Sequence, residues 1–312
     1  MTDAHCHVSG GDPSVREFLI GRDFVGVHPW ATLEEARNGR SVHQTFDQSE
    51  PIRANPWLKG IVGELREKLA ADPWLGVGEI GLDRLKEKTI SSEMRELFAA
   101  QLALAFEFRR PVVLHGAKCW GEVVKQITVN SEQRTDSITE NTEQRTDSIT
   151  ENTEQRTFQN GSSWVPPDQN ASATTSVHCS LFSVHPLCSL FTKNGACPQL
   201  DFAKSGVSLL FHGFSRSDGL IPDIVRLNGY ISVGPAVLND HAVNYRELVK
   251  KIPLDRLLVE TDRDCPCEEL INPLTKQPLM VRDVLEKTAE IRGLAPAELE
   301  AITDENARRF LI

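Results

Sequence analysis

Short apolar runs alternate along the chain with longer stretches in which apolar residues recur at helical spacing. The apolar runs predict buried β-strands at Met1–His5, Phe24–Val27, Leu75–Gly78, Pro111–His115, Val207–His212, Tyr230–Val233 and Leu257–Glu260. The helical spacing predicts helices at Ile61–Ala70, Glu93–Phe108, Trp120–Ile127, Ile221–Leu227 and Tyr245–Lys251, and two or three more over Leu279–Ile312. Strands that alternate with helices predict a parallel sheet built from βαβ units.

The predicted fold class is therefore α/β, with a TIM-like (β/α) barrel of seven to eight strands. The pattern shows seven strands, one fewer than an ideal barrel has. The first βα unit is compressed, because only 20 residues separate His7 from His28. We expect a seven-stranded or partly open barrel.

A repeat with a period of 11 residues interrupts this pattern. Ser131–Asn141 is followed by a near-identical copy at Thr142–Asn152, and a third copy begins at Thr153. Each copy has one Ile among polar residues, so it cannot bury enough surface to offset its conformational entropy. We predict a largely disordered insertion at 128–198 between two parts of one barrel, 1–127 and 199–312. Together these parts hold 241 residues, a typical barrel size.

A second biased tract follows at Ser176–Phe191. His178, Cys179, His185 and Cys188 lie close together there, and a zinc site is one reading of them. The codons for residues 128–135, read on the opposite strand, can specify Cys-Ser-Leu-Phe-Thr-Val-His-Cys, which closely resembles this tract. We therefore interpret 128–198 as the translation of inserted DNA with inverted repeats, which the gene sequence tests directly.

Composition excludes several classes of protein. The chain is 25% charged and 40% hydrophobic, which is ordinary for a soluble globular protein. It has no apolar run long enough for a membrane span and no secretory signal at its start. Seven scattered cysteines suit a reducing compartment, so we expect a cytoplasmic location. The net charge of −10 gives no bulk attraction to phosphate, so any nucleic-acid chemistry requires a local site or a metal.

Polar side chains follow the predicted strands, at the edge where barrel active sites are built. His5 and His7 stand two positions apart, so in a strand both imidazoles can bind one ion; an exposed surface pair is the alternative. Glu79 follows a short apolar run, and a buried carboxylate is costly unless it is paired or bound to metal. An ion pair with Arg84 is the alternative there.

Two further histidines share one arrangement. His115 and His212 each follow three apolar residues and precede a Gly. One such His is more often a hydrogen-bonded core residue, but two at strand ends favour metal ligands. Glu260 and Asp262 come directly after the last buried strand. Together the strand ends supply four histidines and at least two carboxylates, a donor set for two divalent ions.

These motifs, taken in order, resemble the TatD-related deoxyribonuclease family of metal-dependent hydrolases with amidohydrolase-like barrels. The residues that carry the resemblance are Asp3–His7, Gly26–Trp30, Gly76–Asp83, Pro111–His115, His212–Ser215, Glu260–Asp262, Glu305-Asn306 and Arg309-Phe310. The chain departs from the family pattern after Asp262, where Arg263, Asp264 and Cys265 replace a small residue and Pro. Asp264 is a possible extra carboxylate.

The resemblance implies two divalent ions, Mg²⁺, Mn²⁺ or Zn²⁺, that activate a hydroxide for hydrolysis of DNA phosphodiesters. The implied ligands are His5, His7 and Asp262 for the first ion, His115 and His212 for the second, and Glu79 between them. Asp262 and Glu79 are the implied catalytic residues, with Asp262 placed to take a proton from the attacking water.

Two residues are candidates for binding the substrate. The resemblance places His28 beside the site, in contact with a substrate phosphate. Lys118 lies three residues after His115 and can face a phosphate at the barrel rim; a solvated lysine at a helix start is the alternative.

Two other functions stay open. The net charge of −10 and the compressed first unit favour, modestly, a hydrolase of a small phosphoester, cyclic amide or lactone. The insertion also admits an inactive, poorly folded product of a disrupted gene. Whichever holds, we expect DNA or a small phosphoester as the partner, with no membrane and no obligate protein partner.

Deleting 128–198 should leave the Tm equal or higher, because this segment offers no apolar face to pack on the barrel. Thermal melts of the full chain and the deletion variant, followed by circular dichroism, measure the change. A large fall in Tm would show that the insertion packs on the barrel.

Overall fold

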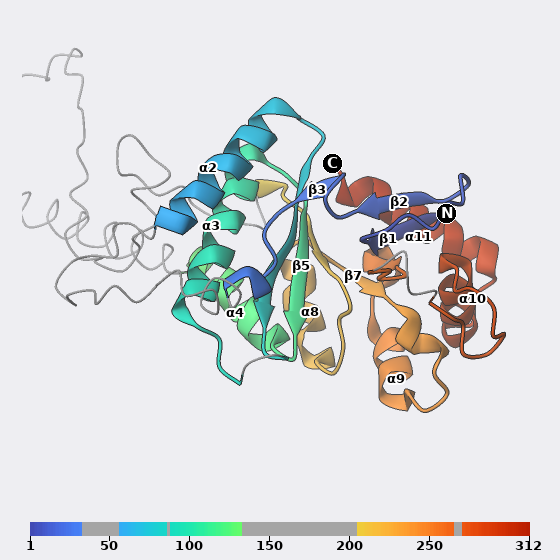
Figure 1. Cartoon of the computed structure of the whole chain (residues 1–312). Helices are drawn as coiled ribbons and strands as arrows, with labels where there is room; N and C mark the ends of the chain where they lie inside the picture. Colours follow the sequence, from blue (N-terminus) through green and yellow to red (C-terminus); the bar gives the residue numbers. More distant parts are fainter. Residues whose placement is uncertain (33–55, 86–87, 133–204, 265–269) are drawn as a thin grey trace, which may run out of the picture.

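The computed structural model describes residues 1–32, 56–85, 88–132, 205–264 and 270–312 (Figure 1). The predicted insertion therefore lies outside the described residues from 133 onward, as does the zinc reading at His178–Cys188. A helix of the barrel, α4 (Trp120–Glu132), continues past the expected end at Ile127. A deletion that keeps α4 whole thus begins at 133.

The described residues form eight β-strands, all paired in parallel. Six of them make one sheet in chain order, and the first two pair with each other. The strands are β1 (Thr2–Cys6), β2 (Arg16–Leu19), β3 (Phe24–Val25), β4 (Gly76–Asp83), β5 (Val112–Ala117), β6 (Leu209–Phe211), β7 (Gly229–Val233) and β8 (Leu257–Val259).

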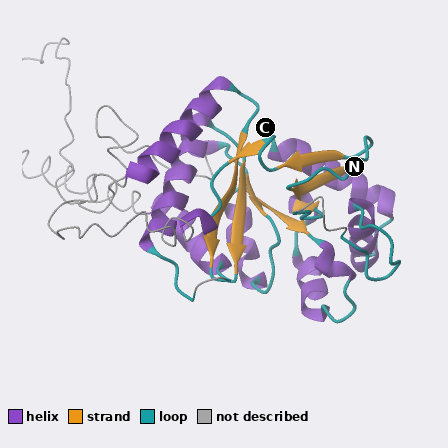
Figure 2. Cartoon of the chain, viewed as in Figure 1, coloured by secondary structure: helices purple, strands orange, loops and turns teal. Residues whose placement is uncertain are grey.

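Helices lie on both sides of these strands (Figures 1 and 2). In Figure 1 α2, α3 and α4 lie on one side and α9, α10 and α11 on the other. No helix in the described part of the chain could cross a membrane. The remaining bounds are α2 (Pro56–Ala71), α3 (Ser92–Phe108), α8 (Ile221–Arg226), α9 (Val243–Lys251), α10 (Val281–Arg292) and α11 (Pro296–Phe310), with 3₁₀ turns at Asp218–Leu220, Pro235–Leu238 and Leu254–Arg256.

Backbone contacts join the two sheets into a ring. The Asp262 N–H donates to the His5 carbonyl at 3.0 Å, which links β1 to the end of β8. At the other seam, an isolated bridge pairs Ile20 with Phe24, after β2 and at the start of β3. The predicted α/β class and TIM-like (β/α) barrel are confirmed.

The eight strands agree with the predicted range of seven to eight, but the pattern revealed seven of them and did not reveal β2. Arg16–Leu19 is short, and it begins with the exposed Arg16 and the half-buried Glu17, so it lacks a continuous apolar run. The chain passes from β1 to β2 through residues 7–15 without a helix. The compressed first unit is therefore a strand–loop–strand connection.

Strands β4 and β5 both extend further than expected, so Glu79 lies within a strand rather than after it, and His115 lies inside its strand rather than at its last position. Gly81 allows this close pairing. Its φ of +153° is strained for other residues, and a Cβ there would collide with the His115 carbonyl oxygen.

Strand alternation separates two apolar layers. Val113, Leu210 and Leu258, on β5, β6 and β8, belong to a buried cluster distinct from the one beneath the helices. Two positions further along the chain, on the same face, come His115, His212 and Glu260. The period of two thus places a polar layer directly above an apolar one, and this arrangement positions the site.

The C-terminal helix α11 completes the apolar layer. The Phe310 ring lies 6.0 Å from those of Phe18 and Phe24, and all three are buried. Asn306 Nδ2 donates to the carbonyls of Leu254 and Leu257 at 2.7 and 2.8 Å, which fixes α11 to the start of β8. The C-terminal motif is therefore structural.

Phe310→Ala should lower the free energy of unfolding by about 3–5 kcal/mol, because it opens a cavity among packed rings. Chemical denaturation measures the change. The exposed Arg308→Ala on the same helix is the control and should stay within about 0.5 kcal/mol of the parent. Equal stability of the two variants would contradict this account of the core.

Candidate metal centre

Histidine and carboxylate groups from β1, β4, β5, β6 and the end of β8 meet above the apolar layer. Three overlapping sets each have ligand atoms within 4.8 Å of one another. The sets are His5–Glu79–His212, His5–His7–Asp262 and His28–Glu79–His115. The structure thus brings together all six residues predicted from the sequence as metal ligands, and adds His28 to them.

Glu79 lies at the middle of the cluster, and its two oxygens face different histidines. Oε1 is 2.5 Å from His115 Nδ1 and 2.6 Å from His212 Nε2. Oε2 is 3.3 Å from His7 Nε2 and 3.8 Å from His5 Nε2. Burial alone would raise the pKa of Glu79, but His212 and hydrogen bonds from the histidines hold that pKa well below its usual range. The buried carboxylate is therefore ionised and faces two histidine sets.

His5 and His212 stack with ring centroids 4.0 Å apart, and both are buried. Burial, then the neighbouring His212, lowers the pKa of His5 to about 4. Burial also acts to lower the pKa of His212, but the Glu79 carboxylate outweighs it and raises that pKa to about 10.

The same two imidazoles test whether the residues fit a metal ion. Both nitrogens of His5, and Nδ1 of His212, are buried without a hydrogen bond to any described residue. Buried polar nitrogens without partners are unfavourable in a chain that binds nothing there. Imidazole nitrogens beside ionised carboxylates are the donors that borderline divalent cations take, and a bound cation would replace the extra proton of His212, so the residues fit such an ion.

Asp262 faces the cluster from the end of β8. Its Oδ1 lies 3.3 Å from His5 Nε2, and its side chain is 41% exposed. Burial acts to raise the pKa of Asp262, but the neighbouring His5 and the charge of His212 lower it to about 2. The residue has a φ of +51°, an uncommon value outside glycine. An ionised carboxylate thus meets both the histidines and solvent.

Two buried carboxylates hold these strand ends without joining the ligand sets. Asp3 accepts hydrogen bonds from Thr261 N at 3.0 Å and from Thr261 Oγ1 at 2.6 Å, across the seam of β1 and β8. Glu260 accepts from Gly213 N at 2.7 Å and from Ser232 Oγ. Burial raises the pKa of Asp3 to about 6 and that of Glu260 to about 7. Sequence reasoning grouped Glu260 with the ligand candidates, whereas its hydrogen bonds join three strand ends.

Asp83 is a functional candidate that sequence reasoning missed. It ends β4 on the same face as Glu79, and its Oδ2 lies 2.8 Å from His115 Nε2 and 2.8 Å from Trp30 Nε1. Burial acts to raise the pKa of Asp83, but the hydrogen bond from His115 and other donors lower it to about 2. The available signal was the even spacing from Glu79 along one strand. Arg84, the alternative partner for Glu79, donates from Nε to the Lys88 carbonyl at 3.2 Å instead.

The substrate candidates occupy different places. His28 Nε2 lies 3.4 Å from His115 Nδ1, at the edge of the cluster. Lys118 follows β5 directly, is exposed, and has a φ of +57°. Asp264 is exposed, with Oδ1 3.6 Å from His7 Nε2. The structure thus places His28 at the cluster and Lys118 on the rim.

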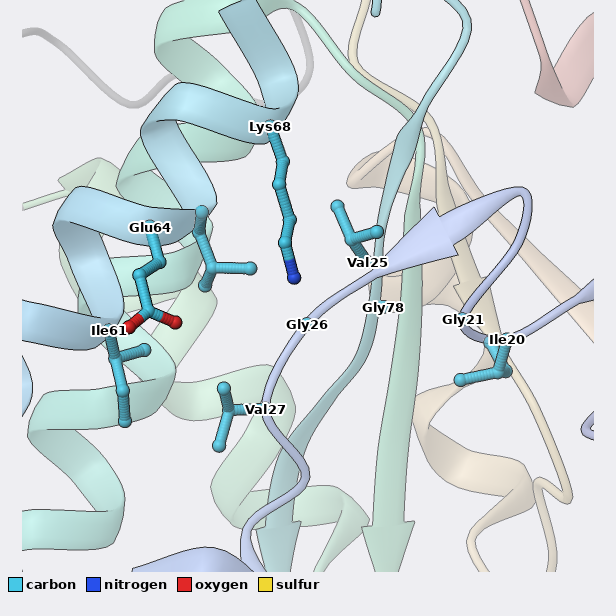
Figure 3. A pocket seen from close by; sticks show the side chains of 10 residues that line it. Ile20, Gly21, Val25, Gly26, Val27, Ile61, Glu64, Lys68 and Gly78 are labelled. Atoms are coloured by element: carbon cyan, nitrogen blue, oxygen red, sulfur yellow. The ribbon is translucent and has the colours of Figure 1, made fainter. Parts of the chain in front are cut away.

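A separate cavity of about 190 Å³ lies between β3 and α2 (Figure 3). Gly26, Val27 and Gly78 line it, and Lys68 reaches into it from α2. None of the predicted site residues lines this cavity, so it does not belong to the metal centre.

Comparisons with known proteins find metal-dependent hydrolases among the relatives of this chain. The family model described as TatD related DNase matches residues 20–182 and 197–311. The "Uncharacterized metal-dependent hydrolase YabD" of Bacillus subtilis is 24% identical over 83% of this chain and 74% of its own length. The "3'-5' ssDNA/RNA exonuclease TatD" of Pectobacterium carotovorum is 24% identical over the same shares.

Solved structures show the same fold. The TatD homologue YJJV from Escherichia coli superposes with a TM-score of 0.54 at 18% identity, covering 96% of this chain and 78% of that one. An uncharacterized amidohydrolase from Saccharomyces cerevisiae gives a TM-score of 0.57 at 18% identity, covering 95% and 81%.

In the metal-free protein, Glu79→Gln should lower the pKa of His212 from its raised value of about 10. Burial already opposes the charged imidazolium, and the substitution removes the carboxylate that outweighs burial. An NMR titration of the His212 ring measures the change. Glu122→Gln, on α4, is the control and should leave the titration as it is. An unchanged pKa in Glu79→Gln would contradict the central role of Glu79.

Proposed function

We propose, because this chain belongs to the TatD-related DNase family of metal-dependent hydrolases, that it hydrolyses phosphodiester bonds of single-stranded DNA with two divalent ions. The observation that carries the proposal is Glu79, whose two carboxylate oxygens face separate histidine sets. A carboxylate in that position can bridge two ions, as two-metal phosphodiester hydrolysis requires.

The ligand roles follow the two sides of Glu79. His5, His7 and Asp262 would hold the first ion with Oε2, and His115 and His212 the second with Oε1. Four imidazoles favour Zn²⁺ or Mn²⁺ over Mg²⁺, because Mg²⁺ prefers oxygen ligands. When bound, such ions lower the pKa of a coordinated water and stabilise charge on the reacting phosphate.

Two side chains beside the ions, Asp262 and His28, would handle the proton of the attacking water and a phosphate oxygen of the substrate. Asp262 is ionised at neutral pH and partly open to solvent, so it can accept the proton of the attacking water. Burial, then the neighbouring His115, lowers the pKa of His28 to about 4. His28 is thus neutral at neutral pH and can donate a hydrogen bond to a phosphate oxygen.

Three exposed cations at neighbouring strand ends supply attraction for phosphate that the whole chain lacks. Arg84 follows β4, Lys118 follows β5 and Arg216 lies in the loop after β6, all with exposed side chains. The Arg84 N–H donates to the Ala117 carbonyl at 2.9 Å, so the first two are adjacent. None of the three makes an ion pair with another described residue. We infer that they contact the nucleic-acid backbone beside the second ion.

A small phosphoester is the second candidate substrate. The connection from β1 to β2 is a loop at 7–15 with no helix, so this connection itself offers little surface to hold a polymer. The net charge of −10 also favours a small phosphoester over a polyanionic nucleic acid. The two substrates differ in whether cleavage depends on the rim cations.

The proposed activity is tested with 5′-labelled single-stranded DNA and Mn²⁺ or Mg²⁺, comparing the intact protein with Asp262→Ala. We expect the intact protein to shorten the DNA and Asp262→Ala to lose more than about 100-fold in rate while keeping its fold, because the second ion keeps its ligands. Near-full activity of Asp262→Ala would refute its role. No cleavage with ions bound would favour the small phosphoester, and no cleavage without ion binding would refute the proposed function.

The double variant Lys118→Ala/Arg216→Ala should raise the KM for oligonucleotides several-fold and reduce the slope of log K against log salt concentration by about 1.4, which is about 0.7 for each lost phosphate contact on a single strand. Hydrolysis of bis(p-nitrophenyl) phosphate should not change, because this substrate has no further phosphates. Arg226→Ala/Lys250→Ala removes two exposed cations from α8 and α9 and is the matched control. A KM equal to that of the control variant would show that Lys118 and Arg216 do not contact the oligonucleotide.

A further inference from the structure

Each ring nitrogen of His115 faces a carboxylate. Nδ1 lies 2.5 Å from Glu79 Oε1, and Nε2 lies 2.8 Å from Asp83 Oδ2. Glu79 is the carboxylate assigned to the ions, whereas Asp83 is buried at the end of β4 and belongs to none of the ligand sets. The proton on His115 therefore has two possible positions, and the partners of Asp83 decide between them.

Asp83 has partners that can only donate. Its Oδ2 accepts from Trp30 Nε1 at 2.8 Å, and its Oδ1 accepts from the Leu85 N–H at 2.5 Å. The indole N–H of Trp30 and the backbone N–H of Leu85 can only donate a hydrogen bond. Asp83 therefore accepts from both as an ionised carboxylate. The third group on Asp83, His115 Nε2, must then carry a hydrogen. That leaves Nδ1 as the nitrogen of His115 with a lone pair for an ion.

His28 has the opposite arrangement. The Trp30 backbone N–H donates to His28 Nδ1 at 3.2 Å, so this nitrogen is an acceptor. In the neutral ring the hydrogen is then on Nε2, which points toward His115 Nδ1 at 3.4 Å. A nitrogen that carries a hydrogen is not a metal ligand.

We propose that Asp83 and the Trp30 backbone N–H impose opposite tautomers on His115 and His28. His115 presents a bare Nδ1 to the second ion, and His28 presents an N–H and donates to the substrate without binding the ion. Asp83 is a positioning residue that acts through His115, because it holds the ring orientation and its hydrogen. This inference rests on the proposed two-ion centre and adds to it the two groups that fix the roles of His115 and His28, namely the Asp83 carboxylate and the Trp30 backbone N–H.

The substitution Asp83→Asn tests the assignment because an amide cannot replace this carboxylate. It has one acceptor oxygen for three donors, so its NH₂ group must face either Leu85 N–H or the pair formed by Trp30 Nε1 and His115 Nε2. Facing His115, it drives the hydrogen to Nδ1 and blocks the ligand atom. Loss of second-site affinity is expected in the range of about 10–100-fold.

Mn²⁺ binding to the full chain, measured by calorimetry, separates the roles. We expect Asp83→Asn to weaken one Mn²⁺ equivalent and leave the other unchanged, and His28→Gln, which keeps a donor, to retain both. Asp23→Asn is the matched control, since Asp23 also accepts a backbone N–H and an arginine but lies away from the histidines. Two equivalents at parental affinity in Asp83→Asn while NMR places the His115 hydrogen on Nδ1, or the loss of one equivalent in His28→Gln, would overturn the inference.

A second measurement does not depend on how Asp83→Asn folds. In the Zn²⁺-loaded parent protein with ¹⁵N-labelled histidine, we expect the His115 hydrogen on Nε2 and the His28 hydrogen on Nε2, with His115→Gln and His28→Gln used to assign the signals. A His115 hydrogen on Nδ1 would contradict the inference. If the parent binds no ion at all, the proposed function itself fails; if it binds two and the tautomers are reversed, only this inference fails.

Discussion

The site depends on one buried negative charge. Glu79 is 4% exposed, within a strand of a parallel sheet, where an isolated carboxylate would be strongly disfavoured. The ionised form of Glu79 is stabilised by hydrogen bonds from His7, His115 and His212, and by the positive charge that these groups or bound cations provide. Because parallel strands end at one edge, the same fold that buries Glu79 also brings its partners from β1, β5 and β6.

Three further buried carboxylates arrange the strand ends around Glu79. Asp3 joins β1 to the end of β8, Glu260 joins the ends of β6, β7 and β8, and Asp83 joins β4 to His115 and Trp30. Each accepts hydrogen bonds from backbone amides or side-chain donors that have few other acceptors. The ligand side chains are thus held by polar contacts whose loss would leave buried groups unpaired. This requirement explains why polar residues follow so many of the strands.

Exposed cations follow three neighbouring strands although the chain is acidic as a whole. The net charge is −10, whereas Arg84 and Lys118 lie at the adjacent ends of β4 and β5 and Arg216 lies in the loop after β6. Screening limits the reach of distant surface charges to about 8–10 Å at ordinary salt, so the local cations count for more than the total. Bound divalent ions would add to that local positive charge.

The residue pattern by itself determined the α/β class, the parallel order of strands, and the histidines and carboxylates at the strand ends. These follow from local rules, since strand and helix periods are visible along the chain and a charged residue beside a buried run needs a partner. Only the tertiary structure revealed β2, whose Arg16–Leu19 has no continuous apolar run and is a strand because β1 and β3 lie beside it. Only the tertiary structure showed that Asp83 faces His115 and that Glu260 accepts from Gly213 and Ser232. Hydrogen-bond partners far apart in the chain are set by strand register, which a single sequence does not encode locally.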